Sequence, residues 1–114
     1  GNLGEKIERL KKEAEELSNK AKEFKSNYKT LDNGIKKINE LTEKRHESTE
    51  AEQEYLNAAN ELGEKFPELG IGFDEAGNAI IDVTNSEEVL INARKEAADA
   101  AYNAAEAELK KVKT

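Results

Sequence analysis

The chain has 114 residues, of which 38% are charged, 36% are hydrophobic and 5% are aromatic, with no tryptophan. This composition argues against a thick globular core and favours helices that each bury a narrow stripe. The net charge of −7, with both signs interspersed, excludes the concentrated lysine and arginine that nucleic-acid binding needs.

Residues 3–45 predict one long coiled-coil helix. Apolar residues recur in alternating steps of four and three, the heptad pattern of a left-handed coiled coil. Ala14 and Ala21 occupy two of these positions. The other members, here called the N-terminal seam, are Leu3, Ile7, Leu10, Leu17, Phe24, Tyr28, Leu31, Ile35 and Ile38. Since nearly all residues between them are polar, the seam must be buried against other helices.

Two stretches of this helix have the composition of a break. Asp32-Asn33-Gly34 has the composition of a turn, but Leu31 and Ile35 keep the heptad phase across it, which favours a continuous helix. The polar run 44–50 predicts that the helix ends near Arg45 and that a short turn follows; the alternative is one unbroken helix to Phe66. His46 is expected to be exposed in this turn, without a metal role.

A second helix is predicted over residues 49–66. Thr49 and Glu52 have the spacing of a capping box. One face of this helix is apolar, and Pro67 ends it. The helix should therefore begin at Thr49 and bury the stripe formed by Tyr55, Leu56, Ala59, Leu62 and Phe66.

Residues 70–84 predict a small β-hairpin. β-Branched and aromatic residues flank the turn-forming run 74–78, in which Gly77 is expected to have a positive φ angle. The apolar residues of the hairpin should cover the ends of the neighbouring helices. A calcium loop starting at Asp74 is rejected, because the EF-hand spacing would place Ala79 where glycine is required.

An alanine-rich helix is predicted over residues 86–113, with Asn85 or Ser86 as N-cap. It should pack antiparallel to the helix 49–66. The first part of the helix 3–45 would then overhang, and self-association through its seam would cover it. The predicted fold is mainly α: a single elongated domain in which long coiled-coil helices form an antiparallel helical hairpin or three-helix arrangement with one small β-hairpin insert.

The residues give no indication of enzyme chemistry. There is no nucleophile–base pair, no phosphate-binding glycine loop and no cysteine, so no catalytic, cofactor-binding or metal site is predicted. No run of residues is apolar enough to span a bilayer, and the polar faces lack the basic excess of interfacial helices. We expect no membrane contact for this segment. The start at Gly1, with no methionine, suggests a fragment of a longer protein.

The run 49–83 resembles a segment of bacteriophage tail tape measure proteins. The shared features are the Thr-x-x-Glu start of a helix, Leu56 and Leu62 on that helix, the sequence Phe-Pro-Glu-Leu at residues 66–69, and Gly-Phe-Asp-Glu-Ala-Gly-Asn-Ala-Ile at residues 72–80. Phe73 stands where the family commonly has tyrosine. The close resemblance covers about a third of the chain. The flanking helices are similar to the family in character only.

This resemblance implies a structural role in the tail tube interior of a virion assembled in the host cytoplasm. The segment would contribute to tail length determination and tail assembly, as a homo-oligomer in contact with tail tube and chaperone proteins. No catalytic residues belong to this part of the family. The alternative is an interaction module of a bacterial coiled-coil surface or secreted protein.

Overall fold

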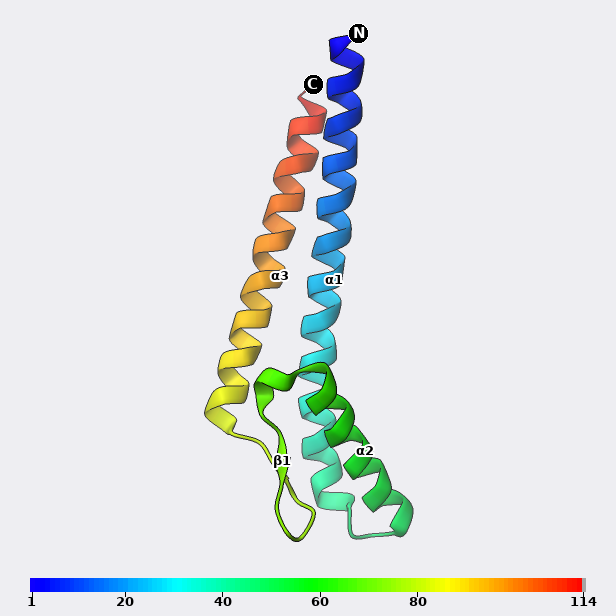
Figure 1. The fold of residues 1–114 in the computed structure, drawn as a ribbon, viewed down its shortest axis with the longest axis vertical. Helices are drawn as coiled ribbons and strands as arrows, with labels where there is room; N and C mark the ends of the chain where they lie inside the picture. Colours follow the sequence, from blue (N-terminus) through cyan, green and yellow to red (C-terminus); the bar gives the residue numbers. More distant parts are fainter. Residues whose placement is uncertain (114) are drawn as a thin grey trace. The chain divides into compact units, whose positions relative to one another are not determined.

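The computed structural model describes residues 1–113 and has a mainly α fold with one small antiparallel hairpin, as predicted (Figure 1). Its elements are α1 (Asn2–Lys44), α2 (Thr49–Lys65), the 3₁₀ turn η1 (Pro67–Leu69), β1 (Gly72–Phe73), β2 (Ala79–Ile80) and α3 (Val83–Val112). The chain divides into two compact units. Unit 1 combines residues 1–28 with the chain from Asn92 onward, and unit 2 contains residues 29–91.

Helix α1 passes through Asp32-Asn33-Gly34 without a break, which confirms the continuous helix. The glycine has a packing role instead. A Cβ atom on Gly34 would lie 2.5 Å from Cδ1 of Leu62 on α2, so a side chain at this position would force Leu62 to shift. The glycine that suggested a turn is instead a point of contact between α1 and α2.

The second helix begins at Thr49, as predicted, and the unbroken helix to Phe66 is wrong. The expected capping box is also wrong. Ser48 is the N-cap: its backbone is extended, and its Oγ accepts a hydrogen bond of 3.0 Å from the Ala51 backbone N–H. Ser48 takes the capping position one residue earlier than expected, which leaves Glu52 available for another contact.

Unit 1 is an antiparallel pair of helical segments, formed by residues 1–28 of α1 and the part of α3 after Asn92 (Figure 1). Small side chains are buried in it: Ala14, Ala100 and Ala107. The predicted packing of the alanine-rich helix against residues 49–66 is therefore wrong, since most of α3 has α1 as its partner. The N-terminal residues that were expected to overhang are only partly covered within the chain: Ala14 is buried, whereas Leu3 is 64% exposed.

Unit 2 contains the end of α1, helix α2, the hairpin and the first turns of α3. Its buried apolar residues come from α1, α2 and η1 and are Leu31, Ile38, Tyr55, Ala59, Leu62 and Leu69. Phe66 is only half-buried, and its backbone N–H donates to the Leu62 carbonyl as α2 ends. Pro67 then starts η1, as its fixed φ angle favours.

Helix α3 begins at Val83, three residues earlier than predicted. Asp82 caps it, because its Oδ1 accepts from the Asn85 backbone N–H at 3.0 Å. The Asn85 side chain instead donates to the Glu68 carbonyl at 3.0 Å and so ties α3 to η1. Ser86 is buried and donates to the Val83 carbonyl. The N-cap assigned to Asn85 or Ser86 is wrong.

The hairpin pairs Gly72 with Ile80 and Phe73 with Ala79. Gly77 has φ of +79°, as predicted. The expectation that the apolar hairpin residues cover the helix ends is only partly met. Phe73 and Ile80 are exposed, whereas Ile71 and Ile81, just outside the strands, are half-buried.

Candidate functional site

The most distinctive polar feature of the chain is a buried arginine in unit 2. Arg45 is the first residue after α1, and only 2% of it is exposed. A guanidinium group removed from water is unfavourable unless its charge is paired and its N–H groups find acceptors. The residues around Arg45 supply these partners from two other parts of unit 2.

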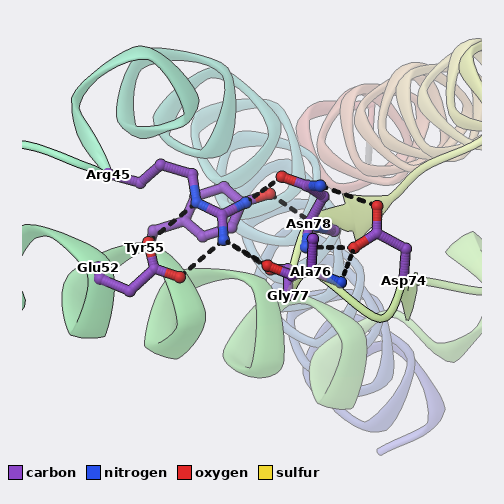
Figure 2. Close-up of polar contacts among 8 residues, drawn as sticks. Arg45, Glu52, Tyr55, Asp74, Ala76, Gly77 and Asn78 are labelled. Atoms are coloured by element: carbon purple, nitrogen blue, oxygen red, sulfur yellow. Dashed lines mark hydrogen bonds and ion pairs between the residues drawn. The ribbon is translucent and has the colours of Figure 1, made fainter.

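The first partner is Glu52, in the first turn of α2. Its carboxylate accepts from Nε of Arg45 at 2.9 Å and from Nη2 at 2.7 Å, the two-pronged geometry favoured by guanidinium and carboxylate (Figure 2). The ring of Tyr55 lies under the guanidinium, with 4.4 Å between the Arg45 Cζ and the ring centroid. Arg45 thus connects the end of α1 to the start of α2.

The second set of partners lies in the hairpin turn. Nη1 of Arg45 donates to Oδ1 of Asn78, and Nη2 donates to the Gly77 carbonyl at 3.1 Å (Figure 2). The Tyr55 hydroxyl accepts from the Ala79 backbone N–H at 2.7 Å. The hairpin is therefore held by α2 as well as by the arginine. We call Arg45, Glu52, Tyr55, Asp74 and Asn78 the turn cluster.

Asp74 gives the hairpin turn its shape. Its Oδ1 accepts from the backbone N–H groups of Ala76 at 2.9 Å and Asn78 at 2.8 Å, and its Oδ2 accepts from the Asn78 side-chain amide at 2.8 Å (Figure 2). Aspartate commonly organises turns in this way. The amide of Asn78 is oriented by Asp74 on one side, so that its oxygen points to Arg45 on the other.

Both carboxylates of the turn cluster are stabilised in their charged form. The hydrogen bonds from Arg45 lower the pKa of Glu52, and its positive charge adds to the effect. The pKa of Asp74 is lowered mainly by the hydrogen bond from the Asn78 side chain and by that residue's backbone N–H. Protonation of either carboxylate would weaken the cluster.

The chemistry of the turn cluster is that of a structural junction. Its charged and polar groups bind one another, and within residues 1–113 no buried side-chain nitrogen or oxygen lacks a hydrogen-bond partner. His46, next to Arg45, is exposed, as predicted. The part of the chain that the structure describes contains no group of three or more histidine, aspartate or glutamate residues placed to hold a metal ion.

The N-terminal seam is divided between two environments. Leu3 is 64% exposed, whereas Leu31 and Ile38 are buried within the chain. The remaining seam residues are half-buried: Ile7, Leu10, Leu17, Phe24, Tyr28 and Ile35. Leu31 and Ile38, which the heptad pattern assigns to self-association, are covered by their own chain and present no surface to a second copy.

The sequence did not reveal the turn cluster. Arg45 stands in the most polar run of the chain, and its partners Glu52 and Asn78 follow 7 and 33 residues later. Arg45 and Glu52 are separated by the turn between α1 and α2, and Asn78 lies in the hairpin, so no single helical or strand period relates the three residues. The available signal was indirect: a hairpin with two strands of two residues each is too short to be stable alone and needs support from outside.

No known protein family, curated protein or solved structure gives a significant match to this chain. Among residues 1–113, no helix is both long enough and apolar enough to cross a membrane.

Proposed function

We propose that this chain is a structural coiled-coil segment of a phage tail tape measure protein, with a part in tail length determination and tail assembly. The proposal rests first on the resemblance of residues 49–83 to that family. Paired helices with narrow apolar stripes and a small hairpin are compatible with such a structural segment.

The main support for the proposal is the role that the residues shared with the family have in this structure. Glu52, Asp74 and Asn78 all belong to the turn cluster, and each is bound to another part of the chain. Pro67 starts the 3₁₀ turn that leads into the hairpin. The residues that resemble the family are thus among those that join α1, α2 and the hairpin.

The proposed partners follow from the same assignment. The segment would form a homo-oligomer through the N-terminal seam and would contact tail tube and chaperone proteins. The seam residues available to a second copy are Leu3 and the half-buried residues of α1. The proposed location is the tail tube interior, after assembly in the host cytoplasm.

Tail length is the direct test. An in-frame deletion of residues 1–114 in the parent gene should shorten the tails seen by electron microscopy, and a duplication should lengthen them, because the length of a tape measure protein sets the length of the tail. A synonymously recoded gene is the matched control. Tails of unchanged length would contradict the proposal. A parent protein found on the cell surface would instead support an interaction module of a coiled-coil surface protein.

A further inference from the structure

A groove of about 530 Å³ lies in unit 2. One wall is the last part of α1, the opposite wall is the start of α3, and Tyr55, Ala79 and Ile81 complete the lining from α2 and the hairpin. Its volume falls within the usual range of protein binding pockets. The groove shares Ile35 and Ile38 with the N-terminal seam, but all of its lining residues belong to unit 2. The inference drawn from it does not depend on the proposed function.

Each long wall is a single helical face. Helix α1 contributes Ile35, Ile38, Asn39 and Thr42, which follow the spacing i, i+3, i+4 and i+7. Helix α3 contributes residues 83, 86, 87 and 90, which repeat the same spacing. Two helices that each present one such stripe to a shared groove leave a place for a third amphipathic helix, which is a common mode of peptide recognition.

Part of this groove is apolar surface in contact with water. Val83 lines it and is 67% exposed, while Ile35, Ile81 and Leu90 are half-buried. Covering such side chains is favourable at roughly 25 cal/mol for each Å² of apolar surface removed from water. An occupant therefore needs apolar side chains on the face that enters the groove.

The net charge of unit 2 indicates what the rest of the occupant should be. Unit 2 has 15 acidic and 6 basic residues, a net charge of −9, whereas unit 1 has 10 acidic and 12 basic residues, a net charge of +2. Glu87 stands in the groove wall, and no basic side chain among residues 1–113 pairs with it. A basic polar face would complement this surface.

We propose that this groove binds an amphipathic helix of a partner protein, with apolar side chains in the groove and lysine or arginine on the flanking face. A second copy of the chain is a poorer fit. Its own helical segments are close to neutral or acidic: residues 1–28 carry 7 basic and 6 acidic side chains, and α2 has a single basic residue, Lys65. Neither of these segments has the excess of basic residues that the acidic surface of unit 2 would attract.

A labelled model peptide tests the proposal. The probe is a helical peptide of about four turns made of leucine and lysine in an amphipathic pattern, and its control has glutamate in place of each lysine. Fluorescence anisotropy with the full chain should show binding of the lysine peptide only. Equal binding of the two peptides, or binding of neither, would overturn the proposal.

Variants then locate the binding. Val83→Asp should lower the affinity for the lysine peptide by about tenfold or more. Ile91→Asp is the matched control, because Ile91 is equally apolar, 65% exposed and on the same helix, but outside the groove. It should leave the affinity unchanged. Circular dichroism of each variant shows that the fold is retained, and equal effects of the two substitutions would overturn the proposal.

Charge is tested with neighbouring glutamates. Glu87→Gln should weaken binding more than Glu88→Gln, since both residues are exposed but only Glu87 lines the groove. Equal losses would show general attraction to an acidic surface and would contradict a site. Self-association without peptide that Val83→Asp reverses would assign the groove to a second copy and would also contradict the proposal.

Discussion

Gly34 and Leu62 are in such close contact that a single added carbon atom cannot fit between them: a Cβ on Gly34 would lie 2.5 Å from the Leu62 Cδ1. Leu62 is 4% exposed, and its side chain would have to shift to admit the added carbon. The glycine that weakens α1 by its intrinsic propensity is thus the residue that allows α2 to pack against it. The loss of helix propensity in α1 is offset by the packing of α1 against α2.

Substitution of Gly34 should therefore destabilise the chain despite any gain in helix propensity. Gly34→Val should lower the free energy of unfolding by about 2 kcal/mol, since overpacking a core typically costs about 1–3 kcal/mol. Gly4→Ala is the control in the same helix, because no atom lies within 4 Å of its added Cβ. It should be neutral or stabilise by up to about 1 kcal/mol. Urea denaturation measures both, and a stabilising Gly34→Val would contradict the packing role.

Acidification should weaken the turn cluster. The pKa values of Glu52 and Asp74 are lowered by folding, so their charged forms stabilise the folded state above the ordinary values of 4.5 and 3.8. This stabilisation is lost as the pH falls below those values through the lowered pKa of each group. Thermal unfolding between pH 7 and pH 3 should show a decreasing Tm.

Two variants test whether the Glu52 carboxylate is responsible for this pH dependence. Glu52→Gln should lower the Tm at pH 7 and flatten its dependence on pH, because the charge that acid would remove is already absent. Glu54→Gln, exposed on the same helix, should retain the wild-type dependence. An unchanged profile for Glu52→Gln would show that the Arg45 contact contributes nothing to stability.

The Tyr55 hydroxyl should stabilise the hairpin. Tyr55→Phe removes the acceptor of the Ala79 backbone N–H, 2.7 Å away, and keeps the ring beneath Arg45. Leaving a partly buried N–H unpaired costs about 1–3 kcal/mol. The free energy of unfolding should fall by that amount, and amide exchange at Ala79 should accelerate. Protection of Ala79 equal to that in the wild type would contradict this contact.

The two glycines with positive φ angles should differ in their tolerance of a side chain. Gly70 and Gly77 have φ angles of +59° and +79°, so alanine is strained at both and costs about 1–2 kcal/mol. Only at Gly77 would the new Cβ meet other groups, with Nη2 of Arg45 at 3.4 Å. Gly77→Ala should therefore be the more destabilising variant in urea denaturation. A reversed order would contradict the crowding at the turn cluster.

Self-association through the N-terminal seam remains a direct prediction. Sedimentation equilibrium should give a mass above the 12.7 kDa of one chain, and it should rise with concentration. Leu3→Glu should reduce association without loss of helix, because Leu3 is 64% exposed. The double variant Leu10→Glu, Leu17→Glu should abolish association but also lower helicity, since both side chains are half-buried. A wild-type monomer at every concentration would contradict the prediction.

The sequence alone determined the kind and order of the elements. The heptad phase across Leu31 and Ile35 predicted an unbroken α1, Pro67 predicted the end of α2, and Gly77 predicted the positive φ angle of the hairpin turn. Each signal acts within a few residues. Helical and strand periods and turn geometry are local properties, so they can be read from a short stretch of the chain.

The tertiary structure decided which residues meet. It paired α3 with the first part of α1, set Gly34 against Leu62 and placed Arg45 among Glu52 and the hairpin turn. None of these contacts follows from a local period, because each depends on how separate stripes and turns fill the space between them. A charged residue in a polar run is expected to be exposed. Arg45 is buried because the fold brings groups that pair its charge and accept its hydrogen bonds.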